Sequence, residues 1–161
     1  MTRRFVFALL ILFASGLPLR GGAQGAPTVV IVVRHAEKGS TPANDPPLTE
    51  AGVVRANALA AVLADANVQA VISTPLVRTK ETARPTAESR GLTVETIALG
   101  SAAEQAKAVV AAVGRHAGQT VLVVGHSNTV GPIIAALGGP KIPDLCDSQY
   151  ASLFTLVLDA K

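Results

Sequence analysis

The chain has 161 residues and a formal net charge of +3, with 49% hydrophobic, 16% charged and 3% aromatic residues. This length suits one domain with its own core rather than two. The composition excludes a disordered, collagen-like or disulfide-rich chain, and the scarcity of aromatic residues means that alanine, valine, leucine and isoleucine must build the core.

The first 25 residues have the layout of a secretory signal peptide. Two arginines precede an apolar run over residues 5–14, and Ala23-Gln24-Gly25 fits a small-x-small cleavage site. An uncleaved membrane anchor is the alternative, although a run of this length, broken by glycine and proline, is short for a spanning helix. We therefore expect a signal peptide over residues 1–25, a mature domain over residues 26–161, and export to the periplasm or the medium.

The signal peptide also accounts for the positive charge. Without Arg3, Arg4 and Arg20, eleven basic residues face eleven acidic ones. A mature chain with no basic excess is not expected to bind nucleic acid, and it would contact a membrane only through an uncleaved signal segment.

After the signal, segments with strand and helix patterns alternate along the chain. The β-branched run over residues 29–33 is typical of a buried strand in a parallel sheet. A proline-rich loop follows, and Thr49 is a good N-cap for a helix over residues 50–64. The apolar residues of this helix have helical spacing: Val53, Val54, Ala58, Leu59, Val62 and Leu63.

The remaining elements continue the alternation. A helix over residues 76–89 is expected to be weakened or divided by Pro85. The other predicted strands cover residues 70–72, 93–97, 120–124 and 153–158, and the other predicted helices cover residues 102–116 and 129–137. The pattern predicts a three-layer α/β/α fold with a mostly parallel sheet, whose last strand is an antiparallel edge or a closing strand.

Two arginines and two histidines follow the strand ends, where open α/β sheets bind ligands. Arg34-His35 follow the first strand, Ser73-Thr74-Pro75 follow the second with Arg78 one helical turn later, and Gly125-His126-Ser127-Asn128 follow the fourth. Arginine binds phosphate in a bidentate manner, and a neutral imidazole is a nucleophile toward phosphorus. The residues at these strand ends therefore predict a site that binds an oxyanion such as phosphate.

Four blocks resemble the histidine phosphatase superfamily, which has the phosphoglycerate mutase-like fold. They are "VVRHAEK", "DPPLTEAG", "STPLVRTKETA" and "VVGHSNTV", in the family's order and spacing. The resemblance covers residues 29–158 and is closest to the short-chain branch. It implies that His35 is the nucleophile that becomes phosphohistidine. It also implies that Arg34, Arg78 and His126 bind the phosphoryl group.

The same resemblance implies that no cofactor or metal is needed. The sequence agrees, since a lone cysteine and scattered histidines form no zinc pattern. Lys38, Ser127 and Asn128 are further candidates for substrate binding, and Lys38 either flanks the phosphate or faces water. The loops over residues 39–47 and 140–150 are expected to line the entrance. Cys146, in the second loop, has no disulfide partner and is expected to be buried.

The proton donor is not assigned. Many short members of the family carry a glutamate after the third strand, but Glu95 is expected inside that strand and Glu104 inside the next helix. Glu37 and Asp45 are other candidates. A general acid contributes about 10²–10⁴-fold to the release of an alcohol, whereas a phosphoramidate depends on one less.

The predicted function is an exported, metal-independent phosphatase of the histidine acid type, a phosphoric monoester hydrolase that acts on a small phosphorylated substrate. The alternatives are a phosphohistidine phosphatase, whose substrate is a phosphoramidate, and a non-catalytic module that binds phosphate. A mutase needs a larger lid than so short a chain offers.

Overall fold

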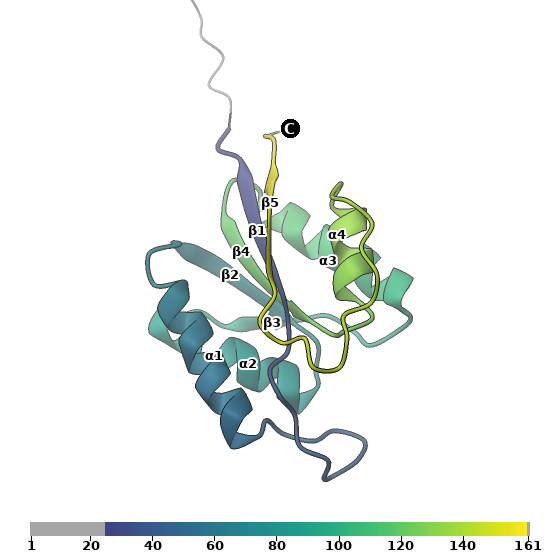
Figure 1. Ribbon diagram of the computed structural model, residues 1–161. Coiled ribbons are helices and arrows are strands. Elements are labelled where there is room, and N and C mark those ends of the chain that lie inside the picture. Colours follow the sequence, from purple (N-terminus) through teal and green to yellow (C-terminus); the bar gives the residue numbers. More distant parts are fainter. Residues whose placement is uncertain (1–24, 161) are drawn as a thin grey trace, which may run out of the picture.

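The computed structural model describes residues 25–160 as a five-stranded sheet flanked by helices (Figure 1). The predicted signal peptide, apart from Gly25, lies outside the described residues. Within them, none of the helices has the length and apolar character needed to cross a membrane.

The sheet has the strand order β3-β2-β4-β1-β5. The pairs β2–β3, β2–β4 and β1–β4 are parallel, while β5 pairs antiparallel with β1 at the edge. The strands are β1 (Thr28–Arg34), β2 (Val68–Ser73), β3 (Val94–Thr96), β4 (Thr120–Gly125) and β5 (Leu153–Leu158). The predicted mostly parallel sheet is confirmed, and the last strand is its antiparallel edge.

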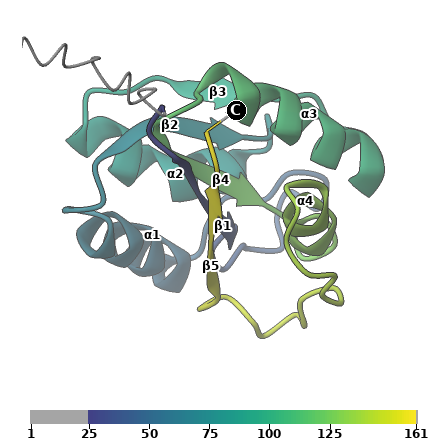
Figure 2. The ribbon, with the colours of Figure 1, turned by 90° about the horizontal axis from the view of Figure 1, so that it is seen from above.

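Helices cover both faces of the sheet (Figure 2). They are α1 (Glu50–Val62), α2 (Val77–Ser89), α3 (Ala102–Arg115) and α4 (Val130–Ala136). Because side chains alternate along a strand, β1 contributes to two cores. Ile31 and Val33 pack on the face that α1 and α2 cover, and Val30 and Val32 pack on the face of α3 and α4. The predicted three-layer α/β/α fold is confirmed.

The apolar spacing of α1 predicts the helix correctly but not its buried face. Val54 and Val62 are exposed, and the buried positions of the helix are Gly52 and Ala56. A side chain on Gly52 would approach the carbonyl oxygen of Glu37 to 2.2 Å, so the first turn of α1 packs directly on the backbone that follows β1. Small residues thus form the contact, because they let α1 approach the backbone after β1 closely.

Pro85 does not divide α2, although division of the helix is one of the two effects expected from the sequence. The helix runs without interruption from Val77 to Ser89. Proline removes one backbone hydrogen bond, but the neighbouring Ala83 and Ala87 are fully buried against the sheet, and this packing keeps the helix continuous.

The strand order brings three functional strand ends together. β4 lies between β1 and β2, and the register pairs Arg34 with Gly125 and Ser73 with Val124. The residues that follow these three strands therefore meet at one edge of the sheet, as ligand-binding residues do in open α/β folds.

Candidate active site

His35 is held rigidly at the end of β1. Its backbone N–H donates to the carbonyl of Gly125 at 2.9 Å, and the next residue, Ala36, donates its N–H to the hydroxyl of Thr82 at 2.9 Å. The ring is buried, and its Nδ1 lies 2.8 Å from the Ala36 carbonyl oxygen. Because a carbonyl only accepts hydrogen bonds, Nδ1 carries the hydrogen and Nε2 carries the lone pair. The ring is thus prepared to attack through Nε2.

His126 stands beside His35 at the end of β4. The two ring centroids are 5.4 Å apart, with an interplanar angle of 64°. The Nε2 atom of His126 lies 3.1 Å from the hydroxyl of Thr74, which in turn lies 2.8 Å from the hydroxyl of Thr79. The two histidines therefore face one small volume, and Thr74, directly after β2, contacts the second ring and is itself held by Thr79 of α2.

The two arginines reach the same volume from different elements. Arg78 comes from the first turn of α2, and its Nη1 lies 3.6 Å from the carboxylate of Asp45. Arg34 ends β1, and its Nη1 donates to the carbonyls of Cys146 at 2.7 Å and Asp147 at 3.2 Å. The Nε groups of both arginines are buried and have no partner among the described residues. These donors are suited to an anionic ligand.

Burial and charge keep both histidines neutral. The pKa of His35 is lowered from 6.5 to about 4, chiefly because the ring is buried; the hydrogen bond to the Ala36 carbonyl opposes this effect, and repulsion from His126, Arg78 and Arg34 adds to it. Burial, followed by repulsion from Arg78 and Arg34, also lowers the pKa of His126 to about 4. A neutral His35 at physiological pH is a nucleophile, whereas an imidazolium is not.

These pKa values predict that the protein loses stability below pH 6.5. Between pH 6.5 and pH 4 the unfolded chain binds protons at both positions while the folded chain does not, so the free energy of unfolding falls as the pH falls. Each histidine contributes up to about 3 kcal/mol to this loss. Urea unfolding at pH 7.5, 6 and 5 measures it. Replacing both rings with glutamine should flatten the curve, and a wild-type curve already flat over this range would contradict the prediction.

The three further candidates for substrate binding lie close to the site in sequence, but no side-chain contact among residues 25–160 connects them to it. Lys38 is exposed, and its backbone forms an isolated bridge with Leu48. Ser127 is half-buried and accepts the Leu145 N–H through its carbonyl, and Asn128 is exposed. They remain predictions.

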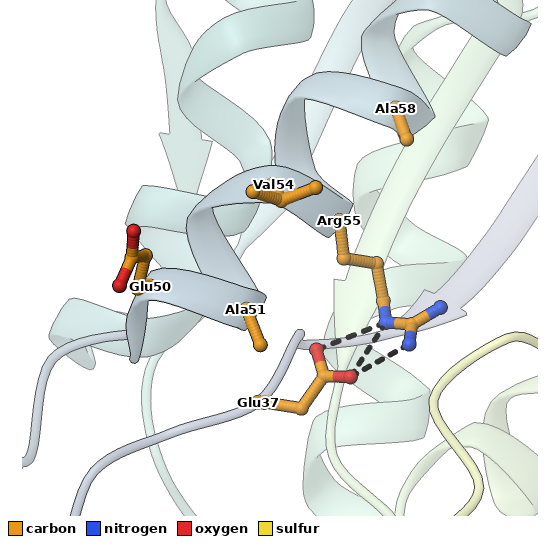
Figure 3. Close-up of a pocket in the computed structure, with 6 residues that line it drawn as sticks. All are labelled: Glu37, Glu50, Ala51, Val54, Arg55 and Ala58. Atoms are coloured by element: carbon orange, nitrogen blue, oxygen red, sulfur yellow. Dashed lines mark hydrogen bonds and ion pairs between the residues drawn. The ribbon is translucent and has the colours of Figure 1, made fainter.

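The glutamates considered as proton donors are engaged elsewhere. Glu37 forms a bidentate pair with Arg55 in a pocket beside α1, which contains neither histidine (Figure 3). Arg55 also holds the pKa of Glu37 below its ordinary value. Glu95 pairs with Arg115 and His116, and Glu104 closes the capping box of α3. This agrees with the sequence analysis, which expects Glu95 inside a strand and Glu104 inside a helix.

Cys146 is exposed, and the expectation that it is buried is wrong. The residue belongs to the irregular segment between α4 and β5, whose backbone carbonyls turn inward to Arg34. The backbone carbonyl of Cys146, rather than its thiol, is therefore the group that contacts the buried Arg34.

Three residues that contact the site have no specific role assigned to them from the sequence. Thr82 positions the strand end that carries His35, Thr74 contacts His126, and Tyr150 stacks on Arg34. Thr82 lies one helical turn after Arg78, so helical periodicity could have identified it. Thr74 follows β2 in the sequence, but Tyr150 has no local signal of its role.

The site combines a neutral imidazole, whose Nε2 is free, with two guanidinium groups at the carboxyl edge of the parallel strands, and such a set of groups is suited to phosphoryl transfer. Among residues 25–160, no group of three or more histidine, cysteine, aspartate or glutamate side chains could hold a metal ion. Residues 30–99 match the sequence model of the histidine phosphatase superfamily, branch 1. Over these residues the chain is similar to this superfamily.

Solved structures of phosphatases share the fold. A mycobacterial glucosyl-3-phosphoglycerate phosphatase is 20% identical, with a TM-score of 0.64, over 80% of this chain and 90% of that one. Phosphoserine phosphatase from Entamoeba histolytica is 17% identical, with a TM-score of 0.59, over 80% and 89%. A protein of Nakamurella multipartitia with the provisional name phosphohistidine phosphatase SixA is 24% identical, with a TM-score of 0.58, over 83% and 86%. No curated protein matches the chain.

Proposed function

We propose that the chain is a metal-independent phosphatase of the histidine acid type, which hydrolyses a small phosphomonoester through a phosphohistidine on His35. The observation that carries the proposal is the state of this ring. Its Nδ1–H is bonded to the Ala36 carbonyl, and burial lowers its pKa to about 4, so that Nε2 is free to attack.

The reaction has two steps in this proposal. Arg34, Arg78 and His126 bind the phosphoryl oxygens, and Nε2 of His35 forms a bond to phosphorus as the bond to the leaving oxygen breaks. Water then attacks the phosphohistidine and releases phosphate. The arginines stabilise the charge on the transferring group, and rigid mounting of His35 keeps the nucleophile in line.

A phosphohistidine phosphatase is the second candidate. A structural relative carries that provisional name, and Glu37, Glu95 and Glu104 are each paired with other groups. A phosphoramidate releases its nitrogen without the strong need for an acid that an alkoxide has. A non-catalytic phosphate-binding module would retain the arginines, but it would not require a neutral, oriented imidazole.

Export is a separate part of the proposal and rests on the sequence of residues 1–25. Fractionation of the producing cells, followed by N-terminal sequencing of the protein, tests it. A mature chain that begins near Ala26 outside the cytoplasm is the expected result. A cytoplasmic chain that retains residues 1–25 would contradict it.

The direct test is to trap the intermediate. We expect the protein to release phosphate from para-nitrophenyl phosphate with a chelator present. Rapid acid-free quenching with a radiolabelled phosphoryl donor should leave a label that is stable in base and lost in acid, as a phosphoramidate is. Bound phosphate without turnover or labelling would support the binding module instead. Turnover that the chelator abolishes would overturn the metal-independent route.

A further inference from the structure

The acidic side chains around the site do not supply an obvious proton donor. Glu37 is held by Arg55, and Glu81 accepts the backbone N–H of Leu48 at 2.7 Å. Asp45 accepts the N–H of Val77 at 2.9 Å and faces Arg78. The carboxylate of Asp147 is fully exposed, 3.8 Å from Nη2 of Arg34. A leaving alkoxide still needs a proton, and the donor must be sought among other groups.

Tyr150 brings a proton-bearing group to the phosphate-binding residues. Its ring centroid lies 4.2 Å from Cζ of Arg34 and 6.4 Å from the ring centroid of His35. Its hydroxyl oxygen lies 3.4 Å from Nη2 of Arg34. Tyr150 therefore contacts one of the proposed phosphate ligands and stands next to the proposed nucleophile.

The contact with Arg34 determines what the hydroxyl can do. A guanidinium has only donors, so the phenol oxygen accepts and its own hydrogen is directed elsewhere. Among residues 25–160, that hydrogen has no acceptor.

The backbone around Tyr150 holds it in this place. Nη1 of Arg34 donates to the carbonyls of Cys146 and Asp147, and a third carbonyl, that of Gln149, lies 3.4 Å away. On the other side, β5 begins at Leu153 and pairs with β1. The segment is thus anchored at both ends to β1, the strand that carries the nucleophile.

We infer that Tyr150 is the general acid of the reaction; this inference rests on the proposed function. In the first step Nε2 of His35 bonds to phosphorus, the bond between phosphorus and the leaving oxygen breaks, and the hydroxyl of Tyr150 gives its proton to that oxygen. The products are an alcohol, a phosphohistidine and a tyrosinate beside Arg34. In the second step a water oxygen bonds to phosphorus, the bond to Nε2 breaks, and the water proton returns to Tyr150.

The experiment compares leaving groups in the wild type and in Tyr150→Phe. Phenylalanine keeps the ring over Arg34 and removes only the hydroxyl, so the fold and phosphate binding should persist. The substrates are para-nitrophenyl phosphate, phenyl phosphate and ethyl phosphate. In this order the leaving group becomes more basic and therefore needs a proton more strongly. The variant should lose on the order of 100-fold more kcat/KM on ethyl phosphate than on para-nitrophenyl phosphate.

The outcomes separate the inference from the proposed function. An equal loss on all three esters would make Tyr150 a binding or positioning residue and would overturn the inference alone. The inference would also be overturned if the loss of kcat/KM grew with the need of the leaving group for a proton in Asp147→Asn or Asp45→Asn, but not in Tyr150→Phe. That result would identify a carboxylate as the acid. A wild type that hydrolyses no ester would overturn the proposed function and the inference together.

A phosphoramidate provides one further control. If Tyr150 acts as the acid for an alkoxide, Tyr150→Phe should hydrolyse phosphoramidate with a loss close to that on para-nitrophenyl phosphate. A loss as large as on ethyl phosphate would contradict general acid catalysis by Tyr150.

Discussion

His35→Ala should abolish turnover, with kcat on para-nitrophenyl phosphate falling by at least about 10⁴-fold. The physical reason is that the variant removes the only protein atom that forms a covalent bond to phosphorus in the proposed mechanism. Both arginines and His126 remain, so inorganic phosphate should still bind. Steady-state kinetics and calorimetric titration with phosphate measure the two properties.

His116→Ala is the matched control. His116 is the C-cap of α3, where its side chain contacts Glu95 and Gln119. This variant should retain wild-type turnover. If His35→Ala kept more than about a tenth of the activity while folded, water would have to attack the ester directly, and the covalent route would be excluded.

Arg78→Lys should lower kcat/KM by about 10³-fold, an effect of the size seen when one group that stabilises a transition state is lost. A lysine keeps the positive charge but loses the planar set of donors, including the buried Nε that has no protein partner. The loss should therefore appear in kcat as well as in KM. A change confined to KM would mean that Arg78 binds substrate and transition state equally.

Arg84 offers a control on the same helix, because it is exposed and separated from the site. Arg84→Lys should leave the kinetics unchanged.

Arg78→Ala provides an independent test through the pH dependence of stability. Arg78 lowers the pKa of both histidines by repulsion, so its removal should raise both values, and the variant should lose less stability between pH 6.5 and pH 5 than the wild type.

The proposed role of Tyr150 connects the site to the choice of substrate. If a phenol supplies the proton, the protein can release ordinary alcohols although the glutamates considered as donors are paired elsewhere. If it does not, the site is limited to leaving groups that need no acid, as in phosphoramidates. The substrates that the wild type accepts thus depend on one hydroxyl, which the sequence places in an irregular loop.

Much of the fold could be predicted from the sequence, because the determinants of its elements are local. The β-branched run of β1 and the N-cap Thr49 are readable from a few neighbouring residues, and the structure confirms both. The motif residues His35, Arg78 and His126 follow strand ends, and parallel strands carry such residues to one edge of a sheet. Convergence of the site therefore follows from the alternation of strands and helices.

The sequence by itself determined the layered α/β fold and the edge at which the histidines and arginines meet. Only the tertiary structure decided which nitrogen of His35 is free, where Glu37 is held, and what surrounds Arg34. The partners of Arg34 lie more than 110 positions away in the chain, at Cys146 and Tyr150. Local patterns set backbone conformation, but hydrogen-bond partners and burial depend on which distant segments the sheet brings together. The state of each ionisable group depends on those partners.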